Sequence, residues 1–273
     1  MATREFVLKP RRGWQPVHWR EVWAHRELFG MLVWRDVKIR YKQTALGAAW
    51  AVLQPFLAML IFTALLHHVN GIQSNGPPYA LFAYAGLVPW LFFMNGVNLS
   101  SSSLVGNQQL VSKIYFPRLY IPLAPIMALF LDMLVALGLM AALMAWYRYP
   151  PSAYLVLLPA FILASYVAAA GPGLILSALN VRFRDVKYAV PFLLQMGMFA
   201  TPVIYPLQTK KLMYRVILGL DPMTGVVDGF RYAIFGTHPD WFRDGLSLAS
   251  AGVIFVIGLF MFRRMELQFT DVI

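Results

Sequence analysis

Residues 79–103 read YALFAYAGLVPWLFFMNGVNLSSSS, and no acidic or basic side chain interrupts them. They lie inside a longer stretch, from Gln43 to Ser112, that contains no Asp, Glu, Lys or Arg. A water-soluble fold cannot cover its surface with so few charges. Because a helix needs ~20 apolar residues to cross a bilayer core of ~30 Å, this stretch predicts an integral membrane protein.

The whole chain of 273 residues has the same character, since 59% of its residues are hydrophobic and 13% are charged. Cutting the charge-poor runs at the length of a bilayer span gives six helices, with turns at Asn70–Pro78 and Tyr149–Pro151. We therefore predict an all-α membrane protein, with a basic arm over residues 1–45 and a six-helix domain over residues 46–273. The predicted spans are Leu46–Val69, Tyr79–Ser103, Ile121–Tyr147, Tyr154–Leu179, Tyr188–Tyr205 and Gly245–Phe262.

Lys and Arg are unevenly distributed between the two sides of these six spans. One side holds ten of them in the N-terminal arm alone, whereas the loop Asn70–Pro78 on the other side holds none. Positive segments are retained in the cytoplasm, so both termini are predicted to be cytoplasmic. This topology accounts for the formal charge of +11 without a nucleic-acid partner. The first long apolar run begins near Leu46, behind the arm, so we expect no cleavable signal peptide.

The end of the basic arm has the pattern of a helix that lies along a membrane surface. Apolar residues recur every fourth position on one face, and cations occupy another. The apolar face consists of Phe29, Val33, Val37 and Tyr41, and the basic face carries Arg35, Lys38 and Lys42. Asp36 and Arg40 interrupt the apolar face. Such a helix is either a plain anchor in membrane lipid or a part of the machinery that admits a substrate.

The segment Pro206–Asp244 is too polar to span a membrane, yet it contains two short apolar runs, Leu212–Leu220 and Val226–Phe235. We predict two short re-entrant or interfacial helices on the outer face, because irregular backbone at membrane depth must be shielded by protein. They either close the outer mouth of a pathway or cap the bundle.

Enzymatic chemistry finds little support in the sequence. No phosphate-binding loop of the form G-x-x-x-x-G-K-[ST] occurs, so the chain is not expected to bind ATP itself. Cysteine is absent, and His67 and His68 are adjacent, which points their rings apart and predicts no metal site. Asp132 is the one carboxylate inside a predicted span. It has no evident partner, and we expect it to hydrogen-bond to a neighbouring helix or to face a wet cavity.

Polar residues in the spans are more informative. Asn95, Asn98 and Ser102 fall at positions i, i+3 and i+7, so they share one face of the second span. That face is either wet or joined to another helix by hydrogen bonds. Nearby aromatic rings can stack on sugars, although membrane belts and core packing also use them. The candidate pathway residues are Gln54, Trp90, Phe93, Asn95, Asn98, Gln195, Phe199 and Tyr205.

Three segments at characteristic spacings carry a family resemblance. They are LVSKIYFPR at 110–118, LNVRFRD at 179–185 and DPMTGVVDGFRY at 221–232. Together they resemble the ABC-2 type permeases that export lipid-linked O-antigen, teichoic acid or capsular polysaccharide, and the resemblance covers nearly the whole length. The third segment departs slightly, since the family often has Asn-Pro where this chain has Asp221-Pro222; either side chain can cap a helix start.

The resemblance implies a homodimer in a bacterial inner membrane, bound to two copies of a separate ATPase that carries the ATP and Mg. Its substrate would be an undecaprenyl-diphosphate-linked glycan that is moved out of the cytoplasm, and O-antigen is the leading candidate. The residues that would couple to the ATPase are Asn107, Lys113, Ile114, Tyr115, Phe116, Pro117, Arg118, Arg182, Arg184 and Asp185. The residues of the periplasmic gate would be Leu212, Tyr214, Asp221, Pro222, Phe230 and Arg231.

The coupling segment has its own physical argument. Without a phosphate loop the chain must receive work through a cytoplasmic surface, and Ile114, Tyr115 and Phe116 are expected to be exposed there, between Lys113 and Arg118. These apolar side chains could insert into a cleft of the partner. The alternative is that the aromatic rings lie among lipid headgroups and bind no partner. Two other functions stay open: an exporter of a drug or smaller lipid, and a membrane glycosyl- or acyltransferase.

Overall fold

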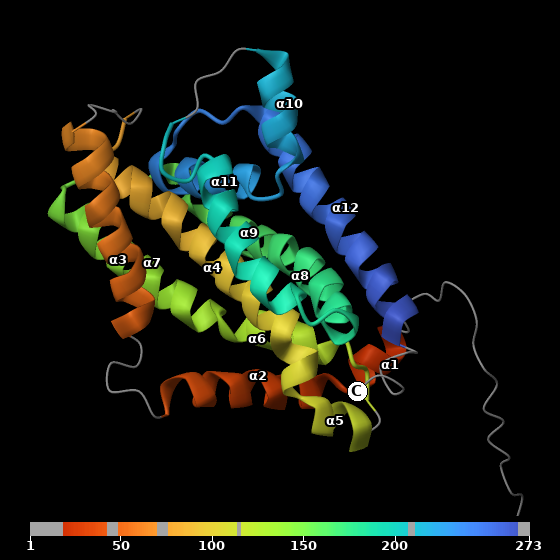
Figure 1. Ribbon diagram of the computed structural model, residues 1–273. Coiled ribbons are helices and arrows are strands. Elements are labelled where there is room, and N and C mark those ends of the chain that lie inside the picture. Colours follow the sequence, from red (N-terminus) through yellow and green to blue (C-terminus); the bar gives the residue numbers. More distant parts are fainter. Residues whose placement is uncertain (1–18, 43–48, 70–75, 114–115, 207–210, 267–273) are drawn as a thin grey trace, which may run out of the picture.

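The computed structural model in Figure 1 describes residues 19–42, 49–69, 76–113, 116–206 and 211–266. Every regular element in these ranges is a helix, and they contain no strand. The predicted all-helical fold is therefore confirmed for the described part of the chain.

Five helical segments in the described ranges are long and apolar enough to cross a membrane. A sixth helix, α9, is apolar but has only 15 residues. At ~1.5 Å per residue it reaches ~22 Å, which is less than a typical bilayer core. The five segments are α3 with the π-helical turn η1 (Ala49–Phe62 and Thr63–Val69), α4 (Tyr79–Gly106), α6 with α7 (Tyr120–Ala128 and Phe130–Trp146), η2 with α8 (Ala153–Leu157 and Leu158–Arg182) and α12 (Trp241–Glu266), and α9 is Val186–Ala200.

Helix α4 forms the centre of the bundle and packs against α3, α6, α7, α8, α9 and α11. Most of its residues are buried, which its charge-free sequence permits. Small residues let the neighbouring backbones approach closely, as is common between membrane helices. A Cβ on Gly258 of α12, for example, would lie 2.6 Å from the carbonyl oxygen of Gly171 in α8.

The predicted span Ile121–Tyr147 is not one continuous helix. The helix is interrupted at Leu129, whose N–H bonds to the oxygen of Ile126, three residues back, at 3.2 Å. Helix α7 begins at the next residue, so Asp132 lies in its first turn. The expected place of Asp132 inside the span is confirmed, since Asp132 lies near the middle of the segment Tyr120–Trp146, which is long and apolar enough to cross a membrane.

The two ends of the bundle differ (Figure 1). At one end, here called the α2 end, α2 (Arg26–Tyr41) lies across the bundle beside α1 (Trp19–Ala24) and α5 (Gln108–Lys113). At the other, the α11 end, lie α10 (Leu212–Leu220) and α11 (Thr224–Phe235). The Tyr120 hydroxyl donates to the oxygen of Val22, and Arg118 donates to the oxygen of Glu266 at 2.8 Å. Both ends of the described chain therefore lie at the α2 end.

Candidate functional site

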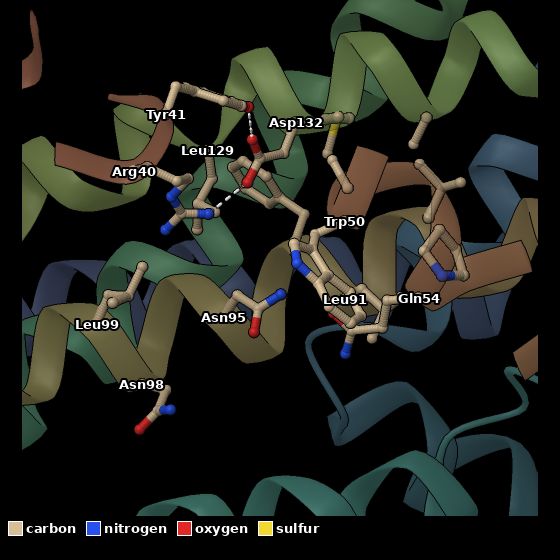
Figure 2. A pocket seen from close by; sticks show the side chains of 16 residues that line it. Arg40, Tyr41, Trp50, Gln54, Leu91, Asn95, Asn98, Leu99, Leu129 and Asp132 are labelled. Carbon is tan, nitrogen blue, oxygen red and sulfur yellow. Dashed lines mark hydrogen bonds and ion pairs between the residues drawn. The ribbon is translucent and has the colours of Figure 1, made fainter. Parts of the chain in front are cut away.

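A cavity of about 350 Å³ opens between α2, α3, α4 and α7 (Figure 2). Its polar lining comes from helices far apart in the sequence: Gln54 from α3, Asn95 and Asn98 from α4, and Asp132 from α7. Arg40 from the end of α2 completes it. Asp132, in the first turn of α7, meets Arg40 of the last turn of α2 at the wall of this cavity.

A second cavity of about 450 Å³ lies on the other side of the same polar face, between α3, α4 and α9. Gln54, Asn95 and Asn98 line both cavities, and Gln195 of α9 joins them in the second. Four predicted pathway residues are thus brought together by the fold.

The sequence left open whether these amides are wet or join helices to one another. Within the described residues, no hydrogen bond holds the side-chain amides of Gln54, Asn95 or Gln195. Asn180 behaves differently, since its amide in α8 donates to the oxygen of Ser101 in α4 at 2.9 Å. The geometry therefore favours a wet role for the first three and a joining role for Asn180.

Arg40 and Tyr41 both bind Asp132, as Figure 2 shows. Arg40 donates from Nη1 to Oδ2, and the Tyr41 hydroxyl donates to Oδ1. Burial, together with this hydrogen bond, raises the pKa of Tyr41 well above its ordinary value, so the phenol stays protonated. The sequence missed these partners, although Arg40 as an interruption of an apolar face and Asp132 as a lone carboxylate were both visible.

The predicted pathway aromatics lie elsewhere. Trp90 and Phe93 are buried in the core, 2% and 7% exposed, with ring centroids 5.4 Å apart, and neither lines the two cavities. Phe199 is half exposed near the end of α9, and the Tyr205 hydroxyl donates to its carbonyl oxygen at 3.0 Å. A role for these rings in a pathway remains a prediction.

Helix α2 packs on α6 with part of its predicted apolar face. The ring of Phe29 lies 5.1 Å from that of Tyr120, and Val33 packs beside the same cluster. Arg35 does not join Lys38 on the outward basic face as predicted. It donates to Asn107 at the end of α4 at 3.0 Å and is paired with Asp36. The positive charge of Arg35 at the C-terminal end of α4 also suits the negative end of that helix dipole.

The predicted coupling segment is only partly described. Ile114 and Tyr115 lie outside the described residues, and so does the side chain of Lys113. Phe116 was predicted to be exposed, but it is 5% exposed and packs in a cluster with Leu32 and Phe262. That expectation was wrong, because α2 and α12 cover the ring. Pro117 is also buried, and Arg118 binds the end of α12.

The turn between α8 and α9 carries exposed side chains at the same end of the bundle. Arg182, Arg184 and Asp185 are exposed there, and so is Phe183, at 53%. The Arg182 guanidinium lies 5.4 Å from the Phe183 ring. An exposed aromatic flanked by cations, which was predicted at Phe116, is therefore present at Phe183.

The two short helices at the α11 end have different environments. Helix α10 has the predicted bounds, and its Leu212 and Tyr214 are 63% and 50% exposed. Helix α11 is buried among α4, α8 and α12, and Phe230 is fully buried. Its Arg231 is 3% exposed and donates to the carbonyl oxygens of Pro202, at 2.8 Å, and Val203.

Acidic side chains complete the attachment of α11. Asp228 pairs with Arg231 at 3.1 Å and with Arg243 of α12. At the start of α11, Asp221 accepts hydrogen bonds from Thr201 at 2.7 Å and from Thr224 at 2.8 Å, while its neighbour Pro222 is half-buried. These contacts join the end of α9 to α11 and α12.

Comparison with known proteins identifies the family. The model of the family described as ABC-2 type transporter matches residues 27–235. The O-antigen export system permease protein RfbA of Myxococcus xanthus is 33% identical over 86% of this chain and 90% of its own length. RfbA of Klebsiella pneumoniae is 26% identical over 90% of this chain and 96% of its own length. The polysialic acid transport protein KpsM of Escherichia coli is 24% identical over 83% of this chain and 87% of its own length. The chain belongs to the ABC-2 type transporter family.

Proposed function

We propose that this ABC-2 type chain is the membrane permease of an exporter that moves a lipid-linked polysaccharide out of the cytoplasm. O-antigen is the leading candidate for that polysaccharide. The relatives named above export O-antigen or transport polysialic acid, and they match the chain over most of its length. The bacterial inner membrane is the corresponding location.

The observation that carries the proposal is the polar face shared by the two cavities. Asn95 is half-buried, and Gln54, Asn98 and Gln195 are exposed along the walls of the two cavities. All four belong to apolar helices, and a polar group that faces lipid without a partner is costly. Amides both donate and accept hydrogen bonds, which matches the hydroxyl groups of a sugar chain. A chain that only needed stability would have apolar side chains here.

The same proposal includes a sixth crossing of the membrane. Both ends of the described chain lie at the α2 end, which requires an even number of crossings. Five segments have the required length, so α9 is the candidate for the sixth. The α2 end carries most of the Lys and Arg and is assigned to the cytoplasm.

Work would come from a separate ATPase bound at the α2 end, with two permeases and two ATPases per complex. The exposed turn at Arg182–Asp185, with Phe183 beside it, is the best supported docking point in the described residues. The segment around Tyr115 remains a second point of contact in this proposal. ATP and Mg are assigned to the partner.

The test is export of glycan in cells that lack the native chain. We expect Asn95→Leu with Asn98→Leu to leave the amount of folded permease near normal while lipid-linked glycan accumulates in the cytoplasm. Asn180→Leu is the matched control, because it removes a hydrogen bond between helices and should reduce folded protein and export together.

Two results would contradict the proposal. Glycan that reaches the surface normally without the chain would exclude it as the exporter. Turnover of a sugar donor by the purified chain alone would favour a membrane transferase instead.

A further inference from the structure

Among the ion pairs of the described residues, the Arg40–Asp132 pair both joins two helices and lines a cavity. It joins the last turn of α2 to the first turn of α7 and forms part of a cavity wall (Figure 2). The two side chains are 31% and 18% exposed, so water reaches both. Among the described residues that line this cavity, they are the only charged ones. A pair that only held two helices together would not need to face an open cavity.

The chemistry of the pair suits a particular exchange. A guanidinium binds carboxylate and phosphate oxygens with the same fork of N–H donors. Asp132 therefore occupies the position that a phosphate would take in its absence. The nearby acidic residue Asp36 is already neutralised by Arg35 at 2.8 Å, so the end of α2 keeps an excess of positive charge.

The surroundings restrict what could bring a phosphate there. On the cavity side lie the amides of Gln54, Asn95 and Asn98, which suit hydroxyl groups. On the outer surfaces of α3 and α7, Leu57 and Leu134 are 45% and 59% exposed and would face lipid tails. A ligand with an apolar chain, a phosphate and a polar headgroup, in that order, matches all three surfaces.

We propose that Arg40 and Asp132 form an exchangeable anion site, in which the phosphate or diphosphate of a membrane lipid displaces Asp132 from the Arg40 guanidinium. Tyr41 stays protonated and can donate its hydrogen bond to either anion. When Asp132 is displaced, α2 loses its attachment to α7, and the cavity opens at the α2 end. The inference deepens the proposed function, on which it rests, by naming the group that is recognised on entry.

The experiment measures binding by the full-length chain in nanodiscs of phosphatidylcholine. The probes are geranylgeranyl diphosphate, the uncharged alcohol geranylgeraniol, and inorganic diphosphate. We expect the prenyl diphosphate to bind at least tenfold more tightly than the other two. Binding of inorganic diphosphate equal to that of the lipid would overturn the membrane-lipid source, and equal binding of the alcohol would overturn the anion site.

Variants separate binding from structure. Arg40→Gln should weaken binding of the prenyl diphosphate at least tenfold, and Asp132→Asn should strengthen it several-fold, because no carboxylate competes. The reversed pair, Arg40→Asp with Asp132→Arg, should restore the wild-type melting temperature without restoring affinity. Recovery of both by the reversed pair would show that the ion pair is purely structural.

The readout is independent of glycan export. If deletion of the chain leaves export unchanged, the proposed function fails, while the lipid titration still decides the anion site. If export depends on the chain but Arg40→Gln binds the lipid diphosphate normally, only the anion site fails.

Discussion

The two ends of the bundle are attached in different ways. At the α11 end, Arg231 binds two carbonyl oxygens and lies 3.6 Å from the Phe82 ring, and Asp228 bridges it to Arg243. At the α2 end, one carboxylate, Asp132, receives the last two side chains of α2. Regions with many buried contacts open at a high free-energy cost, and regions with few open readily. The first part of α2 is packed in a buried cluster with Phe116 and Phe262, so the comparison indicates a fixed α11 end and a last turn of α2 that can open.

Removal of Arg231 should have the largest effect. Arg231→Leu removes one of the two cations paired with Asp228 and leaves two buried carbonyl groups without their donor, and loss of one partner of a buried pair costs about 3–5 kcal/mol. We expect little folded protein after detergent extraction, measured by size-exclusion chromatography. Arg231→Lys keeps the charge but not the fork of donors and should be intermediate. A normal yield of Arg231→Leu would mean that the α11 end is not held as described.

Crowding at the same end predicts the next effect. A Cβ on Gly86 would lie 2.5 Å from the carbonyl oxygen of Val203, which is backbone and cannot move aside cheaply. Gly86→Ala should therefore destabilise the chain by about 1–3 kcal/mol, seen as a lower melting temperature. Gly138→Ala on α7 is the control, since nothing lies within 4 Å of its Cβ. Equal melting temperatures for the two variants would contradict the close packing.

The ion pair at the α2 end should contribute less. Because Arg40 and Asp132 are partly exposed, Asp132→Asn should cost about 1 kcal/mol or less. The same variant should loosen α2, so a cysteine introduced at Gln54 should react faster with a maleimide. The chain has no cysteine of its own, which keeps the background low. An unchanged rate would show that this pair does not restrict the cavity.

Acid should produce the smallest effect, at α10. The hydrogen bonds from Arg215 lower the pKa of Asp240 below its ordinary value of ~3.9. A carboxylate whose pKa is lowered by folding stabilises the fold at pH values above its ordinary pKa. This contribution is lost as the pH falls through the lower pKa of the folded state. Amide exchange in α10 should therefore rise only below about pH 4, and Asp240→Asn should remove that step. A rise near neutral pH would contradict this assignment.

Much of this fold follows from where charge is absent. The charge-free run around residues 79–103 became α4, the helix at the centre of the bundle, because only a buried or lipid-facing helix can lack charge for so long. The apolar run Leu212–Leu220 gave a helix with those bounds. The break at Leu129 was not foreseen, since Pro125 signals a disturbed helix but does not fix where the chain resumes.

The sequence predicted the polar residues of the candidate site but not its ion pair. Gln54 and Gln195 were singled out as polar residues in apolar spans, and the fold brings them to one polar face. The pairing of Arg40 with Asp132 could not be read from the sequence, because 92 residues separate them and only tertiary packing brings α2 to α7. The exposure predicted for Phe116 was wrong for the same reason, since the residues that bury its ring, Leu32 and Phe262 among them, are distant in the sequence.

During transport, the last turn of α2 should move away from α7, while the α11 end stays fixed. Spin labels at exposed positions can measure both, in complexes with one labelled copy. Ile39 on α2 with Leu134 on α7 reports on the α2 end, and Trp146 with Trp241 reports on the α11 end. During ATP hydrolysis we predict a second, longer distance for the first pair and a single unchanged distance for the second. A fixed distance at the α2 end, with a changing distance at the α11 end, would contradict the claim.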